Sequence, residues 1–178
     1  MQPQSPFDQP VSLVSSKATY SAVLVDYTPP ATATDFFILP GVTGKKVSLV
    51  GIRVSGSATL AAYQGLYLYK RTSPNTPGTT TPTLSAKYDS LDPAASSIPT
   101  QALTNPSVLG SGVIMRSDHL PLAAVGAVGA PELIWNWGDR ACKMPCLNSA
   151  SEFFALSLLG LAVAGGANIH ATIEWTEE

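Results

Sequence analysis

A histidine beside an acidic residue is the part of this sequence that comes nearest to acid–base chemistry. Asp118 and His119 are adjacent, and a histidine acts as a general base when a partner fixes its tautomer and a nucleophile lies within reach. The sequence holds no G-x-S-x-G motif to supply that nucleophile. His119 also precedes Leu-Pro-Leu at a strand exit, where a surface histidine is ordinary. We therefore predict no catalytic site and no enzyme activity, and we expect His170 to be a cross-strand partner.

Residues that bind metal ions are equally sparse. Asp89 and Asp92 lie three residues apart in YDSLDP, but the alternating oxygen ligands of a calcium loop are missing, and turn formation explains both. Cys142 and Cys146, in CKMPC, are too few for a four-ligand zinc site. A disulfide across so short a loop is the alternative to two reduced structural thiols, and we favour the thiols. We predict no metal.

The segment GVTGKK at residues 41–46 looks like a phosphate-binding loop only superficially. Such a loop needs G-x-x-x-x-G-K followed by Ser or Thr, because backbone amides cradle the phosphates and the hydroxyl reaches magnesium. Here the two glycines are too close together, and Lys46 stands where the hydroxyl is needed. We interpret the segment as a hairpin turn between two strands, and we predict no cofactor.

Composition excludes two classes of partner. The 178 residues carry a net charge of −2, only 12% are charged, and no basic block is present, so the clustered cations of a nucleic-acid groove are missing. The most apolar run, residues 153–167, is shorter than the ~20 residues of a membrane span and contains three glycines. The first ten residues have no basic region and no apolar core of a secretory signal. We expect neither nucleic-acid nor membrane binding.

Short apolar or alternating runs, separated by Gly, Pro, Asn or Asp, predict the elements that must position any site. We predict an all-β fold, an antiparallel jelly-roll-like β-sandwich of about eight strands with long loops. Residues 17–178 form one domain in this prediction, and residues 1–16, rich in Gln, Pro and Ser, form a flexible N-terminal arm. The strand candidates are residues 18–27, 35–39, 45–56, 61–71, 111–117, 133–137, 152–161 and 168–176, with weaker ones at 85–89 and 144–148.

Side-chain periodicity gives these strands their faces. In the last run, Ile169, Ala171, Ile173 and Trp175 alternate with polar residues, which predicts one buried face. In residues 45–56 the apolar parity changes after Leu49, so we predict a β-bulge near Val50-Gly51. The run FFALSLLGL is apolar on both faces and should lie deep inside or at a subunit contact. We predict a loop at residues 122–132 and one short helical turn at residues 95–104.

The fourteen residues KRTSPNTPGTTTPT, at 70–83, follow the strand signal LYLY. Pro74, Pro77 and Pro82 restrict the backbone and Gly78 permits a turn, so this long loop should be stiff. Loops of this length in compact domains are usually functional or disordered. A second polar excursion covers residues 89–112. Two such excursions from a small β-core suggest contacts with neighbouring molecules.

Several segments together resemble small structural proteins of tailed bacteriophages, and head decoration (cement) proteins with a jelly-roll sandwich. They are TDFFILPG, KKVSLVGIRVSGSAT, LYLYKRTSPNTPGTTTPT, KYDSLDPAASS, TNPSVLGSGVIMRSDHLPL, IWNWGDR and ANIHATIEWTEE. The resemblance implies a virion component on the outer capsid surface, made in the host cytoplasm. Its implied partners are the major capsid protein and copies of itself, as a homotrimer. It brings no active-site residues.

Capsid or subunit contacts are expected in the arm, in the 70–83 loop and at two tryptophans. Trp135 and Trp137 share a strand face, where a core or interface role is favoured over stacking on sugars. The expected contact residues are Gln2, Pro3, Pro6, Phe7, Arg71, Pro74, Asn75, Pro77, Thr80, Trp135 and Trp137.

Two alternatives stay open: a head-fibre or tail-associated module that binds host-surface glycans, and a metal-dependent jelly-roll enzyme.

Overall fold

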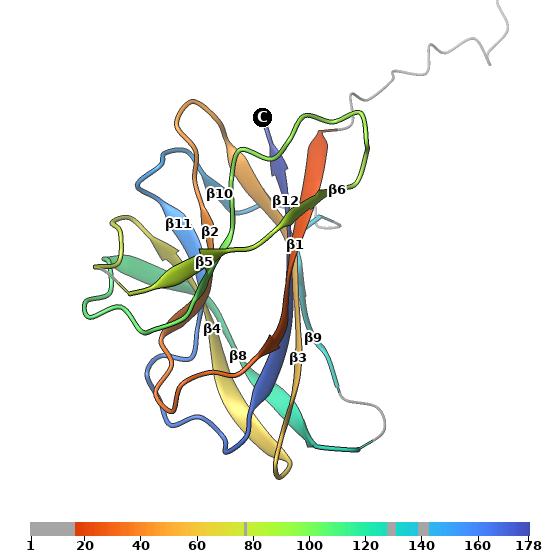
Figure 1. The fold of residues 1–178 in the computed structure, drawn as a ribbon. Coiled ribbons are helices and arrows are strands. Elements are labelled where there is room, and N and C mark those ends of the chain that lie inside the picture. The colour runs from red at the N-terminus through yellow and green to blue at the C-terminus, as the bar shows by residue number, and fades with distance from the viewer. Residues whose placement is uncertain (1–16, 77, 128–130, 139–142) are drawn as a thin grey trace, which may run out of the picture.

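The computed structural model describes residues 17–76, 78–127, 131–138 and 143–178, and these ranges contain strands and turns but no helix (Figure 1). The all-β prediction is confirmed. The strands are β1 (Ala18–Tyr27), β2 (Asp35–Pro40), β3 (Val47–Ala58), β4 (Ala62–Arg71), β5 (Thr80–Pro82), β6 (Ser85–Lys87), β7 (Thr100–Ala102), β8 (Gly112–Ala124), β9 (Leu133–Asn136), β10 (Cys146–Leu147), β11 (Phe153–Ser157) and β12 (Asn168–Glu177).

All eight strand candidates are present, and the two weaker ones contain β6 and β10. The sequence does not predict β5 and β7, which are three residues long and are held by pairing with each other and with β2. β7 lies where a short helical turn is predicted, so that prediction is wrong. β8 continues through Ala124, into the segment predicted as a loop. Pairing of its last two residues with β3 keeps that end extended.

The strands form one mixed, curled sheet with the order β5-β7-β2-β11-β4-β8-β3-β12-β1-β6, and β9 and β10 add to β3. Most neighbours are antiparallel, as predicted, but β3 and β8 pair in parallel. β8 pairs with β4 along most of its length and with β3 at its end, so it joins the two halves of the sheet. Figure 1 shows these halves converging where β4 and β8 meet β3.

One hydrophobic core lies between the two halves and draws residues from both. The predicted face of β12 is confirmed, since Ile169, Ala171, Ile173 and Trp175 are at most 1% exposed. Residues 153–158 of the apolar run FFALSLLGL are buried, as expected, but Leu159 and Leu161 in the turn after β11 are 38% and 48% exposed, so the interior position is confirmed only for the first six residues. The Tyr20 and Trp175 rings meet in this core, with their centroids 5.7 Å apart.

The predicted bulge in β3 is confirmed. Glu174 of β12 is opposite Gly51, whereas Trp175 is opposite Leu49, so Val50 is the extra residue. The insertion lets Leu49 and Ile52 both point into the core although their spacing is odd. A run whose hydrophobic parity changes can therefore remain one strand.

Residues 41–46 form a turn, but not a hairpin. The backbone N–H of Lys45 donates to the Val42 carbonyl at 3.3 Å, and Gly44 has a φ of 75°, a left-handed conformation that favours glycine. The strands on either side, β2 and β3, lie in different halves of the sheet and do not pair with each other. The turn therefore carries the chain from one half to the other.

Candidate interaction site

The polar loop that follows β4 folds back over the sheet and is joined to a second loop. We call residues 72–76, 78–83 and 103–111 the loop platform. The Thr72 N–H donates to the Ser111 carbonyl at 2.8 Å, and the Thr76 N–H donates to the Val108 carbonyl at 2.9 Å. Further along, the Leu103 N–H donates to the Thr79 carbonyl at 2.7 Å. Backbone hydrogen bonds thus fasten the two loops together, and the stiffness of the 70–83 loop stays a prediction.

A buried ion pair anchors the loop platform to the sheet. Arg71, at the end of β4, donates from Nε and Nη2 to the two carboxylate oxygens of Asp35 at 2.9 and 2.8 Å. Asp35 is 1% exposed and Arg71 is 5% exposed. The Tyr69 ring lies 4.1 Å from the guanidinium carbon. Two carboxylate oxygens and an aromatic face are the partners that the planar, forked guanidinium needs when it is buried.

The same ion pair reaches into both loops. Nη1 of Arg71 donates to the Gly110 carbonyl at 2.8 Å, and Nδ2 of Asn75 donates to Asp35 at 3.1 Å. Oδ1 of Asn75 accepts the Gly110 N–H at 2.8 Å. A Cβ on Gly110 would lie 1.9 Å from the Ser73 carbonyl oxygen, so only glycine fits there. One residue from each half of the loop platform is therefore fixed by one buried charge pair.

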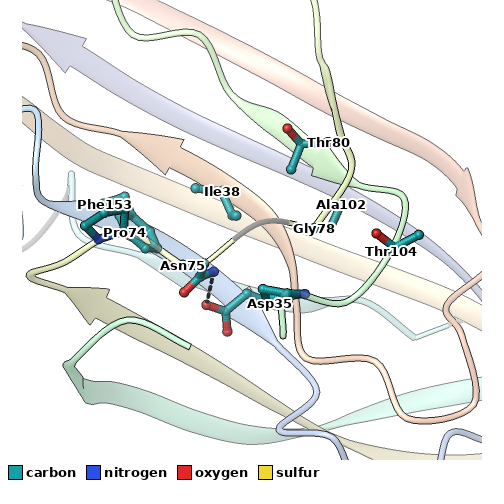
Figure 2. A pocket seen from close by; sticks show the side chains of 10 residues that line it. Asp35, Ile38, Pro74, Asn75, Gly78, Thr80, Ala102, Thr104 and Phe153 are labelled. Carbon is teal, nitrogen blue, oxygen red and sulfur yellow. Dashed lines mark hydrogen bonds between the residues drawn. The ribbon is translucent and has the colours of Figure 1, made fainter. Parts of the chain in front are cut away.

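A pocket of about 240 Å³ lies between the loop platform and the outer face of β2 and β11. In Figure 2, Asp35 and Asn75 share a hydrogen bond on one side of this pocket, and Thr80 lies on the other. Its charged group is already fully paired, so the free lining is mostly apolar with threonine hydroxyls. Such a lining suits an apolar group. The lining residues are Asp35, Ile38, Pro74, Asn75, Gly78, Thr80, Ala102, Thr104, Pro106 and Phe153.

A second buried carboxylate holds the chain that precedes β7. Glu177 is 7% exposed and accepts hydrogen bonds from the Ser97 N–H at 2.9 Å and from Trp175 Nε1 at 3.2 Å. Nζ of Lys45 lies 3.0 Å from the same carboxylate. Burial alone raises the pKa of Glu177, but these donors and the Ser96 N–H outweigh burial and bring the pKa below its usual value. The carboxylate therefore remains charged at neutral pH.

The structure brings together only some of the predicted contact residues. Pro74, Asn75 and Thr80 line the pocket of the loop platform. Arg71 and Trp135 are buried within the chain, so a partner could touch their side chains only if the chain opened. Trp137 is partly buried and packs against the core. Gln2, Pro3, Pro6, Phe7 and Pro77 lie outside the described residues.

The candidate chemical residues do not converge within the described ranges. Asp118 and His119 are exposed on β8, where the aspartate only accepts the His119 N–H at 2.9 Å. His170 faces Asp26 of β1, with Nε2 and Oδ1 3.4 Å apart, which confirms a cross-strand role. Oδ1 of Asp89 accepts the Leu91 N–H at 2.9 Å, as a turn requires.

The described residues include no group of three or more His, Cys, Asp or Glu side chains that could hold a metal ion. Cys146 is a free thiol, but Cys142 lies outside the described residues, as does the Asp139-Arg140 pair.

Sequence reasoning missed Asp35, Gly110 and Glu177. Asp35 opens the apolar strand DFFILP, and a charge in an apolar run of a chain this poor in charge is a usable signal for a buried ion pair. Its partner lies 36 residues away, and no local pattern connects them. Gly110 and Glu177 carry no signal of their own, because their roles depend on loops that return to the sheet.

Comparisons of this chain with family models, with curated proteins and with solved structures find no match. Within the described ranges, no helix has the length and apolar character needed to cross a membrane.

Proposed function

We propose that this chain is a structural protein of a tailed-bacteriophage virion, which decorates the outer surface of the head shell. In this proposal it binds the major capsid protein and copies of itself and stabilises the shell through protein–protein contacts. It performs no catalysis there. The support is twofold: the sequence resemblance given above, and a surface platform of fixed shape.

The buried anchor of the loop platform is the observation that carries the proposal. Only 12% of the residues are charged, yet Asp35 and Arg71 lie buried beneath two surface loops. A buried ion pair adds little net stability, and we infer that its role here is to fix one loop conformation. A loop already held in its bound shape loses less conformational entropy on binding.

In the mechanism that we propose, a weak contact between the loop platform and the capsid protein is repeated many times over the shell. In each copy, the pocket of the loop platform would receive a side chain of the capsid protein, and Thr80 would add polar contacts to it. A shell presents the same site many times, and copies that also touch one another bind with an effective concentration far above their free concentration. Weak single contacts then give stable decoration.

We also propose that the curled sheet is a variant of the jelly-roll-like β-sandwich. Two groups of strands enclose one core, and β8 passes from one group to the other. A crystal structure in which the strands close into one continuous barrel, without two facing groups, would contradict this assignment.

Copy number in purified particles tests the proposal. Quantitative mass spectrometry is expected to find this chain in an amount comparable to the major capsid protein. The variant Thr80→Arg, on the pocket wall, should lower this occupancy, whereas Val23→Arg, on the exposed face of β1, should leave it unchanged. A chain that is absent, or present at only a few copies per particle, would contradict the proposal.

A further inference from the structure

Half of strand β8 has an open edge. Along residues 112–119, β8 pairs with β4 on one side, while its pairing with β3 on the other side is confined to its last two residues. In this half every residue except Arg116 is exposed, and Val113, Ile114 and Met115 are 65%, 49% and 41% exposed. An exposed apolar edge strand offers unpaired backbone groups to a strand of another molecule.

The charges on this edge are arranged symmetrically. Arg116 and Asp118 flank Ser117 and lie on the same face of the strand, since side chains alternate. If two β8 strands pair antiparallel about a twofold axis at Ser117, Arg116 of each copy lies directly opposite Asp118 of the other. Opposite charges in directly facing positions stabilise a sheet, and the symmetry makes this contact twice.

Regular pairing about Ser117 covers residues 116–118. Met115 is the extra residue of a bulge in β8, because Leu68 of β4 is opposite Arg116 whereas Tyr69 is opposite Ile114. Val113, Ile114 and Met115 lie at or beyond this bulge, where the second molecule would cover part of their exposed surface. Arg116 is held in place before pairing, because its guanidinium carbon lies 5.7 Å from the ring centre of the buried Trp135. A guanidinium that is already positioned loses less entropy when it meets a carboxylate.

We propose that two copies of this chain associate edge to edge through β8, with residues 116–118 paired about a twofold axis at Ser117 and the apolar residues 113–115 covered beside them. The pairing joins the β4–β8 half of one sheet to that of the other and covers an edge that is open in the monomer. It rests on the structure of β8 and stands whether or not the chain decorates a virus particle. It also differs from the homotrimer that the sequence resemblance implies.

Charge exchange tests the register with a matched set of variants. The variants Arg116→Asp and Asp118→Arg each place like charges opposite one another twice, and each should weaken self-association about tenfold or more. The double variant R116D/D118R should restore it. An equimolar mixture of the two single variants should form a mixed dimer. The Arg116→Asp variant then has two acidic side chains at positions 116 and 118, and the Asp118→Arg variant has two basic ones, so opposite charges face each other twice. Val25→Lys, on the exposed face of β1, serves as the control.

Sedimentation velocity on the full chain gives the mass, and circular dichroism checks that each variant is folded. A wild-type dimer with the expected loss, rescue and mixed pairing supports the proposal. A monomer at the highest soluble concentration, a trimer, or a dimer that ignores both charge reversals would overturn it. If the chain is a monomer, the open edge of β8 would instead be a candidate binding site for a different protein.

Discussion

At the residue scale, the Asp35–Arg71 pair determines the shape of the candidate site. Both side chains are buried, and between them they bind Asn75 and Gly110 of the loop platform. Each group is satisfied by the other, so removal of either leaves an uncompensated charge. The pair is therefore a structural anchor that also defines one wall of the pocket.

Asp35→Ala should lower the free energy of unfolding by about 3–5 kcal/mol, because it leaves the Arg71 guanidinium buried without its carboxylate. Urea unfolding followed by tryptophan fluorescence measures this change. The partly exposed Asp92 provides the control, and Asp92→Ala should cost less than about 1 kcal/mol. Equal effects of the two substitutions would show that the pair does not anchor the fold.

Glu177 should make stability depend on pH in the acidic range. Hydrogen bonds hold its pKa in the folded chain below the ordinary value of 4.5, so the folded state favours the ionised carboxylate. This contribution is present above the unfolded-state pKa and is lost as pH falls through the lower folded-state value. The stability difference between wild type and Glu177→Gln should therefore shrink below about pH 4.5.

Chemical denaturation at a series of pH values measures that difference. A difference between the two proteins that stays constant from neutral to strongly acidic pH would contradict the assignment. The comparison isolates Glu177 because the other carboxylates are common to both proteins.

At the element scale, the loop platform depends on close backbone approach at Gly110. Gly110→Ala would place a methyl group 1.9 Å from the Ser73 carbonyl oxygen, so the two loops must separate, at a cost of about 1–3 kcal/mol. Hydrogen exchange should become faster at the Thr72 and Thr76 amides, while the β12 amides stay protected. Gly165→Ala is the matched control, since nothing lies within 4 Å of its added Cβ. Unchanged exchange in the Gly110 variant would refute this close packing.

Elements with a local pattern could be predicted, and those that depend on distant partners could not. The alternation of β12 and the parity change at Val50 lie in the sequence itself, so the buried face and the bulge could both be foreseen. The three-residue strands β5 and β7 exist through pairing with each other and with β2. The parallel contact of β3 with β8, and the pairing of Asp35 with Arg71, bring together segments that only the folded chain makes neighbours.

At the scale of the whole molecule, several large apolar side chains are exposed and only 12% of the residues are charged. Tyr63, Leu84 and Leu91 are 77%, 93% and 91% exposed, and the open half of β8 adds three more large apolar residues. A surface with little charge tends to associate, and exposed apolar groups mark contact regions. The loop platform and the open edge of β8 are therefore the two regions where we expect contacts with other molecules.

Cryo-electron microscopy of intact particles, assembled from the genome that encodes this chain, tests the central claim most directly. We expect density for the curled sheet on the outside of the head shell, with the pocket beside Asp35 and Thr80 occupied by a side chain of the capsid protein. Shells without such density, or bound copies whose loop platform faces open solvent, would contradict the account.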